Sequence, residues 1–321
     1  MEMAKNRFPE NEPVAVSIRC ITYNHAPYIR QCLDGFVMQK TSFRFQAVVH
    51  DDASTDGTAE IVREYAEKYP DVIVPIYEEE NRWSKHDGSL WTVMSPLLVG
   101  KYLAHCEGDD FWTDPYKLQK QVDFLEAHPD YVLTYTDFSV VDAESHILKK
   151  KKKKRYSGLC TEPLLLQGNF VFTGTTLYRR EFDDEWPGFM RSLPIKTKQS
   201  DYVHWLFLSS KGLFKYIDED TTSYRILGQS ASHFMKFQDA RCFYEQARDV
   251  RLYFNALFGA GLPGNKMLKA CHLDLIRAAA SYDRKDFLEE LYKGLKVSPS
   301  LLLQPKIWGL ILIRAILNKR V

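Results

Sequence analysis

The sequence lacks the cysteine patterns of a metal or disulfide framework. Its six cysteines are scattered over 321 residues, with no CxxC pair and no paired Cys/His spacing. These spacings exclude the common structural zinc sites, and a chain of this length does not need a disulfide framework. We therefore expect buried free thiols in a reducing compartment.

The sequence also lacks long apolar runs and an excess of either charge. Its longest uninterrupted apolar stretch, residues 307–313, is far shorter than the roughly 20 residues of a membrane-spanning helix. The polar residues 1–13 contain no apolar core of a secretory signal. The sequence contains 43 basic and 42 acidic residues, for a formal net charge of +1. This overall charge does not indicate a nucleic-acid partner.

Strand-like and helix-like segments alternate through the first half of the chain. Helical patterns, one of them over residues 89–99 with Pro96 as its kink or end, separate five expected strands: 14–21, 45–50, 72–77, 102–106 and 131–141. This alternation predicts an α/β fold with a mostly parallel sheet and helices on both faces. Further along we expect a strand over 170–179, a short helix over 202–208 and strands within 214–226. From residue 236 the pattern is helical.

Two clusters of acidic residues follow expected strands. Asp51 and Asp52 come after the second strand, and Glu107, Asp109 and Asp110 come after the fourth. Ligands bind at the carboxyl ends of strands in open α/β sheets. One carboxylate there can accept hydrogen bonds from a base or ribose, and another can hold a hard cation that offsets the charge of a diphosphate. A single Asp in such a place is more often a helix cap or turn residue, but two clusters in this order favour a binding site.

Three segments around these clusters resemble the motifs of family 2 glycosyltransferases of the GT-A fold. The first is residues 22–29 (TYNHAPYI) and the second is residues 51–58 (DDASTDGT). The third has two parts, residues 100–102 (GKY) and residues 107–112 (EGDDFW). The resemblance implies a Rossmann-like sheet in which Thr22, Asn24 and Asp52, with Asp51 beside them, line a nucleoside pocket. It implies that Asp109 and Asp110 bind a metal–diphosphate group, with Mg²⁺ or Mn²⁺ as the metal. Glu107 replaces the first acid of the family's DxD motif with a side chain one methylene longer, which leaves its role as a ligand open.

The second half resembles the family more loosely. Residues 172–180 (FTGTTLYRR), residues 200–206 (SDYVHWL) and Tyr224–Arg225 are similar to later family segments near the acceptor. Asp201 lies where inverting members carry the catalytic base, although it could instead cap the expected helix. The resemblance implies a tail (1–13), a GT-A catalytic domain (14–235, with a nucleotide-sugar half 14–140 and an acceptor half 141–235) and a helical region (236–321).

The implied activity is inverting transfer of one sugar from a nucleotide diphosphate sugar, UDP-linked by resemblance, to a glycan or lipid-linked acceptor in polysaccharide or glycolipid biosynthesis. The absence of the family's QxxRW motif favours a single addition over polymer synthesis. Two alternatives stay open: an inactive nucleotide-sugar-binding scaffold, and a sugar nucleotidyltransferase. The second would need a glycine-rich basic loop where Thr22, Tyr23, Asn24 and His25 stand.

The missing secretory signal and the scattered cysteines lead us to expect a cytoplasmic protein, and two cationic features suggest a peripheral position at the inner face of the cell membrane. Residues 149–155 are seven cations in a row, and residues 307–317 form an apolar stretch with cations around it. Both would be attracted to an anionic membrane surface. The alternatives are a solvated loop for the first and a helix docked on the core for the second.

Overall fold

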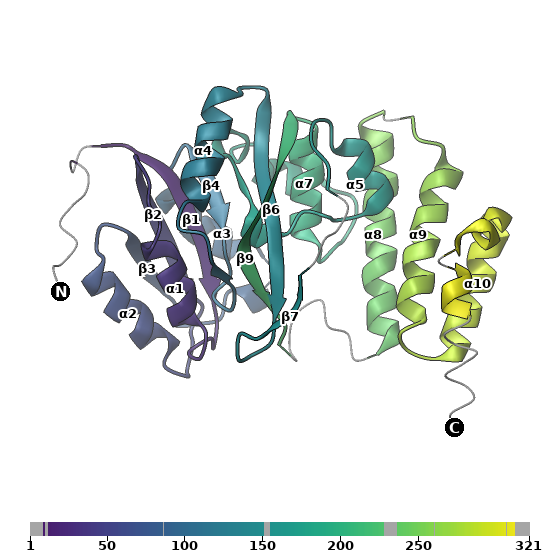
Figure 1. Ribbon diagram of the computed structural model, residues 1–321, viewed down its shortest axis with the longest axis horizontal. Coiled ribbons are helices and arrows are strands. Elements are labelled where there is room, and N and C mark those ends of the chain that lie inside the picture. Colours follow the sequence, from purple (N-terminus) through teal and green to yellow (C-terminus); the bar gives the residue numbers. More distant parts are fainter. Residues whose placement is uncertain are drawn as a thin grey trace. The chain divides into compact units, whose positions relative to one another are not determined.

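The computed structural model describes residue 9 and residues 12–85, 87–150, 155–227, 236–259, 261–305 and 307–311 (Figure 1). The chain forms two compact units. The first contains Met1–Leu159, Val171–Gly188 and Lys211–Leu227, and the second contains Cys160–Phe170, Phe189–Ser210 and Gly228–Val321.

A nine-stranded mixed sheet forms the centre of the first unit, with the order β3-β2-β1-β4-β8-β6-β9-β5 and with β7 paired to β6. Its strands are β1 (Val14–Thr22), β2 (Arg44–Asp51), β3 (Ile73–Tyr77), β4 (Tyr102–His105), β5 (Phe111–Trp112), β6 (Tyr131–Val141), β7 (Ile147–Lys150), β8 (Leu177–Arg179) and β9 (Leu213–Arg225). The pairs β1–β2, β1–β4, β2–β3 and β6–β9 are parallel, and β8 runs antiparallel between β4 and β6. The predicted α/β fold is confirmed.

Helices cover both faces of this sheet (Figure 1). On β1, Ile18 and Cys20 point to one face and share an apolar core with α1 (Ile29–Val37), α2 (Thr58–Lys68) and α4 (Lys117–Ala127). Arg19 points to the other face because side chains alternate along a strand. There its guanidinium lies 5.7 Å from the ring of Trp91 in α3 (Ser89–Met94). All six cysteines are free and five are buried, as expected.

A proline shortens one of the expected helices. The helix expected over 89–99 stops at Met94, and a 3-10 turn, η2 (Ser95–Leu97), takes in Pro96. Another short turn, η1 (Trp83–Lys85), precedes it.

The strand expected over 170–179 is wrong for most of its length, because only Leu177–Arg179 is extended. The residues before it form the turn η3 (Thr173–Thr175), in which the hydroxyls of Thr175 and Thr176 donate to the carbonyls of Phe172 and Thr173. Threonine hydroxyls that bond to nearby carbonyls compete with a sheet ladder. In the cationic run, Lys149 and Lys150 belong to β7 rather than to a loop, and residues 151–154 lie outside the described residues.

The second unit is helical. It contains α5 (Thr161–Gln167), α7 (Ser200–Ser209), α8 (Phe237–Leu257), α9 (Gly264–Ala279), α10 (Arg284–Val297) and η5 (Pro299–Leu303), while η4 (Arg180–Phe182) belongs to the first unit and α6 (Trp186–Ser192) spans the boundary. Ile276, Phe287, Leu301 and Ile307 pack in its core. Of the C-terminal apolar stretch, Ile307 is therefore docked on the core, and residues 312–317 lie outside the described residues. No helix in the described ranges is long and apolar enough to cross a bilayer.

Candidate functional site

Three sequence segments meet at the carboxyl edge of β1, β2 and β4. The backbone N–H of Asp52 donates to the carbonyl of Thr22 at 3.0 Å, and that of Gly108 donates to the carbonyl of Ile21 at 2.9 Å. The edge of the sheet therefore brings together the ends of the three strands that the sequence predicted as neighbours. Thr22, Asn24, Asp51, Asp52, Glu107, Asp109 and Asp110 all belong to these segments of the first unit.

Hydrogen bonds between residues 22–26 and residues 51–58 set the shape of this edge. Asn24 has a φ of 54°, a left-handed conformation that asparagine tolerates well. Its side-chain oxygen accepts the N–H of Thr55 at 2.9 Å. Asp56 accepts from the backbone of Ala26 and from both the N–H and the hydroxyl of Thr58. Asn24 and Asp56 thus fix two loops against each other.

The neighbouring acids Asp51 and Asp52 are bound differently. Asp52 is fully buried, and its two oxygens accept the backbone N–H groups of Arg82 at 2.7 Å and Trp83 at 3.0 Å. Asp52 therefore anchors the segment that leads into η1, and each oxygen keeps a second lone pair for a further donor. In Asp51, Oδ2 accepts the N–H of Ser54 at 3.1 Å, and burial raises the pKa of the carboxyl.

Three buried polar atoms of the segments 22–26 and 51–58 have no hydrogen-bond partner within the described ranges. They are Thr22 Oγ1, His25 Nδ1 and Asp51 Oδ1. Burying such groups costs free energy unless they are hydrogen-bonded. Their grouping at the ends of β1 and β2 indicates a place where a polar ligand or ordered water completes the structure.

The loop of residues 107–110 carries the second group of acids. Asp110 is 3% exposed, and its Oδ1 accepts the backbone N–H of Arg225 at 2.8 Å. Burial, and then the charge of Asp109, raise the pKa of Asp110 well above its usual range. Glu107 is exposed, and its carbonyl accepts from the N–H of Asp110. A bound cation would relieve this concentration of negative charge, and carboxylates are the ligands that Mg²⁺ and Mn²⁺ prefer. The residues therefore fit a divalent metal.

Gly108 allows this loop to lie against β1. A Cβ atom at this position would stand 2.5 Å from Thr22 Oγ1 and 3.0 Å from His25 Nδ1. No real Cβ tolerates the first distance, so only glycine permits the observed approach. His25 is one site neighbour that the sequence motifs did not assign: Asp109, Asp56 and Asp51 all favour its protonation, but burial outweighs them and lowers its pKa.

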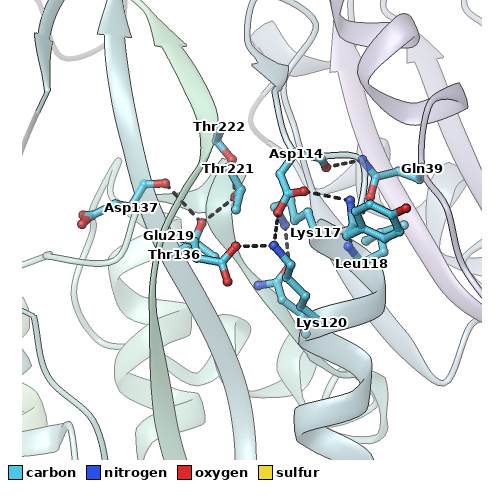
Figure 2. A network of polar contacts seen from close by, with 12 residues as sticks. Gln39, Asp114, Lys117, Leu118, Lys120, Thr136, Asp137, Glu219, Thr221 and Thr222 are labelled. Carbon is cyan, nitrogen blue, oxygen red and sulfur yellow. Dashed lines mark hydrogen bonds and ion pairs between the residues drawn. The ribbon is translucent and has the colours of Figure 1, made fainter.

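A polar network fixes the chain that follows the acidic loop (Figure 2). The side chain of Gln39 donates to the carbonyl of Asp114 at 2.9 Å and accepts the N–H of Leu118 at 3.2 Å. The Asp114 carboxylate accepts from Lys120 at 2.9 Å, and Lys120 also pairs with Glu219 of β9. This network ties the start of α4 to the segment after α1 and to β9, and so gives the acidic loop a rigid C-terminal support.

A separate acidic group lies in the turn between β6 and β7. Asp142, Glu144 and His146 are the described residues whose ligand atoms converge within 4.8 Å. The turn is largely exposed, and His146 is bonded to Asp142. In the sequence this group appears only as a D-x-E-x-H spacing, and such exposed groups are common without an ion.

Asp201 lies in the second unit. It stands in the first turn of α7, whose N-cap residue is Gln199, so Asp201 is not the cap. Its Oδ2 accepts from the side-chain amide of Asn169 at 2.8 Å. Burial raises the pKa of the Asp201 carboxyl, although hydrogen bonds from Tyr202 and Asn169 oppose that effect.

Sequence comparison identifies relatives of this chain. The sequence model of Glycosyl transferase family 2 matches residues 17–186. An uncharacterized protein of Mycobacterium tuberculosis (strain ATCC 25618 / H37Rv) is 39% identical over 232 residues, which cover 72% of this chain and 64% of that protein. The chain thus matches less than two thirds of the mycobacterial protein's length. The putative teichuronic acid biosynthesis glycosyltransferase TuaG of Bacillus subtilis is 28% identical over 243 residues, 74% of this chain and 90% of TuaG.

Solved structures share the fold. S. aureus TarS 1–349 in complex with UDP superposes with a TM-score of 0.56 at 16% identity, over 94% of this chain and 88% of that one. The mannosyltransferase PcManGT from Pyrobaculum calidifontis, in complex with GDP-Man and Mn²⁺, gives a TM-score of 0.52 at 16% identity, over 98% and 91% of the two chains. At this identity the likeness establishes the GT-A fold.

Proposed function

The chain belongs to glycosyltransferase family 2, and from this premise we propose that it transfers a single sugar from a UDP-sugar to an acceptor hydroxyl with inversion. The acceptor in this proposal is a growing glycan or a lipid-linked sugar. TarS, which has the same fold, has been crystallised with UDP and with UDP-GlcNAc, which supports a uridine nucleotide as the first donor to test.

The observation that carries the proposal is the carboxyl edge with its unpartnered polar atoms. Thr22 Oγ1 and Asp51 Oδ1 are buried without partners in the described part of the chain, and Asp52 keeps lone pairs for a donor group. A nucleoside offers the ring N–H and ribose hydroxyls that such atoms require. We assign Thr22, Asn24, Asp51 and Asp52 to the nucleoside pocket, with Asn24 and Asp52 also shaping its loops.

We assign the diphosphate to the loop of residues 107–110. Asp109 and Asp110 would hold a divalent metal, Mg²⁺ or Mn²⁺, and Glu107 could join them from its exposed position. When bound, the metal would neutralise charge on the nucleotide diphosphate leaving group. The protein's own contribution is to keep two carboxylates in place beside Gly108 and the end of β1.

We assign the base to Asp201. An acceptor hydroxyl must lose its proton as its oxygen attacks the anomeric carbon, and a carboxylate with a raised pKa is a suitable acceptor for that proton. The hydrogen bond from Asn169 to Oδ2 orients the carboxylate. Inversion follows if the attack occurs in one displacement.

Thermal stabilisation by a panel of nucleotide-sugars, with and without Mn²⁺, tests donor binding, because a ligand that binds the native state raises its apparent stability. Release of free UDP from the stabilising donor then separates an enzyme from an inactive scaffold. Release of pyrophosphate from a sugar phosphate and a nucleoside triphosphate would instead identify a nucleotidyltransferase.

Asp109→Ala and Asp110→Ala should abolish most turnover, and turnover that survives EDTA unchanged contradicts the metal role.

We further propose a peripheral position at an anionic membrane surface, on the inner face of the cell membrane. Residues 149–154 and 308–317, most of them outside the described residues, supply cations and apolar side chains. Ile307 packs in the core of the second unit and Arg155 pairs with Asp137, so these two residues take no part. Replacing residues 149–154 by serine, or removing the residues after 305, should reduce co-sedimentation with acidic liposomes at low salt, where surface attraction is strongest. If the intact protein does not sediment with these liposomes, the proposal fails.

A further inference from the structure

Arg225, the last residue of β9, is a buried cation at the base of the acidic loop. It is 1% exposed, and its guanidinium lies 4.7 Å from the Tyr28 ring and 5.4 Å from the Phe111 ring. It donates to five acceptors: the carbonyls of Asp109, Asp142 and Ala143, the hydroxyl of Ser145 and the side-chain oxygen of Gln31. Over the described residues these acceptors are all neutral groups.

The same residue holds the acidic loop at two points. Its Nε donates to the carbonyl of Asp109 at 2.9 Å, and its backbone N–H donates to Oδ1 of Asp110 at 2.8 Å. One bond fixes the backbone of the loop, and the other fixes the direction of a carboxylate. Nη2 donates to Gln31 Oε1 at 2.7 Å, which links the same guanidinium to α1.

These contacts place a positive charge behind the acids. The charges of Asp109 and Glu107 act against a negative charge on Asp110, and the positive charge of Arg225 offsets part of this repulsion. A guanidinium bonded to carbonyls, rather than neutralised by its own carboxylate, keeps its charge available to such neighbours. Because its five N–H groups form a rigid planar fork, it also restricts where each bonded segment lies.

We propose that Arg225 is a positioning residue that holds Asp109 and Asp110 in their metal-binding arrangement before the metal arrives. The inference rests on the proposed metal site at residues 107–110. Arg225 acts through the loop and does not touch the donor. Its partners Gln31 and Ser145 accept from the two Nη atoms, whereas the loop carbonyl of Asp109 accepts from Nε.

The test is a calorimetric titration of the folded protein with Mn²⁺ in the absence of nucleotide. Arg225→Lys keeps the charge but loses the fork, so several carbonyls lose their donor. We expect Mn²⁺ affinity to fall by roughly 10-fold or more, as it does when residues behind metal ligands are changed. A second titration with UDP should show weaker binding only when Mn²⁺ is present.

Arg179→Lys is the matched control. Arg179 also donates to backbone carbonyls, those of Tyr131 at 2.9 Å and Leu125 at 2.6 Å, but it pairs with Tyr102 at the beginning of β4, away from the acidic loop. It should lose stability without a change in Mn²⁺ affinity. An equal loss of affinity in both variants would mean that general destabilisation explains the effect, and would overturn the inference.

Gln31→Leu keeps the test decisive if Arg225→Lys does not fold, because it removes one acceptor of the guanidinium from the surface of α1. It should weaken Mn²⁺ binding in the same direction, and wild-type affinity in this variant would overturn the inference. Unchanged Mn²⁺ affinity in a folded Arg225→Lys protein overturns the inference about Arg225 but leaves the proposed metal role standing. If the wild-type protein does not bind Mn²⁺, the proposed metal role fails, and the inference fails with it.

Discussion

The ammonium group of Lys117 lies 4.4 Å from the centroid of the Trp112 ring, fully withdrawn from solvent. Its hydrogen-bond acceptor is the side-chain oxygen of Gln121 at 2.7 Å. Burial lowers the pKa of Lys117 to about 7, although Cys106 and Asp114 oppose that effect. Trp112 in turn donates to the carbonyl of Gly174 at 2.9 Å, so the lysine packs on a residue of β5, the strand that follows the acidic loop.

This buried lysine predicts a pH-dependent stability. Between about pH 7 and the unfolded pKa of about 10.5, the unfolded chain holds a proton that the folded chain has lost, so stability rises with pH. A single such group adds up to about 1.4 kcal/mol per pH unit. Urea unfolding across this window should show a steeper rise for the wild type than for Lys117→Met. Lys120→Met is the control, because Lys120 is on the same helix but its side chain is 40% exposed, and it should keep the wild-type slope of unfolding free energy against pH. Equal slopes for the wild type and Lys117→Met would contradict the assignment of a buried ammonium group.

Gly108→Ala should impair metal binding through the loop. The new Cβ would overlap Thr22 Oγ1 at 2.5 Å, and the loop must move away from β1. Overpacking of this kind typically costs about 1–3 kcal/mol. We expect lower stability together with weaker Mn²⁺ binding in a calorimetric titration. Gly188→Ala, where a Cβ meets nothing within 4 Å, serves as the control and should retain wild-type affinity; full Mn²⁺ affinity in Gly108→Ala would show that the acids do not depend on this approach.

Asp52→Ala should weaken binding of UDP even without an attached sugar. The substitution leaves the backbone N–H groups of Arg82 and Trp83 without their acceptor. It also removes the second lone pair of each carboxylate oxygen, which we expect to accept from the nucleoside. Bonds to a charged group contribute about 1.5–3 kcal/mol each, so an affinity loss of roughly 10-fold or more is expected. Asp87→Ala is the control, because Asp87 caps its own local turn at Ser89. Unaltered UDP affinity in Asp52→Ala would remove Asp52 from the nucleoside pocket.

Asp201→Asn should leave folding and donor binding nearly intact while lowering the transfer rate by roughly 10²–10⁴-fold, the usual contribution of a general base. Asparagine retains an oxygen that can accept from Asn169 but cannot take a proton at neutral pH. A transfer assay and a melting experiment on Asp201→Asn and Asp201→Ala separate the two roles. A purely structural Asp201 predicts near-normal turnover in the Asn variant and lower stability in the Ala variant.

Short-range patterns predicted the strands and the acidic clusters because each depends on a few consecutive residues. The period of β1 and β2 and the acids after them are visible in the sequence, and the structure confirms that these strand ends meet. The roles assigned to the site residues stay predictions.

What could not be predicted depends on contacts between distant residues. The bond from Arg225 to the carbonyl of Asp109 joins residues 116 positions apart, and no local pattern indicates it. The anchoring of Asp52 by the backbone of Arg82 and Trp83 is equally invisible, because backbone donors carry no sequence signature. At residues 172–176 the hydroxyl groups of Thr175 and Thr176 bond to nearby carbonyls and override the β-propensity of these threonines.

The division of the chain has a consequence for the order in which its parts can fold on a ribosome. The first unit is complete once Leu227 has emerged, whereas the second unit takes three separate segments, the last of which starts at Gly228. Until α8 is synthesised, the aromatic cluster around Phe189, which contacts Phe207 of α7, lacks Phe254. The nascent chain therefore carries α7 with only its earlier partners, among them α5, whose Leu164 carbonyl accepts from Tyr202, while about 47 further residues are added, a few seconds at common elongation rates. That interval is when a chaperone would have the most to bind.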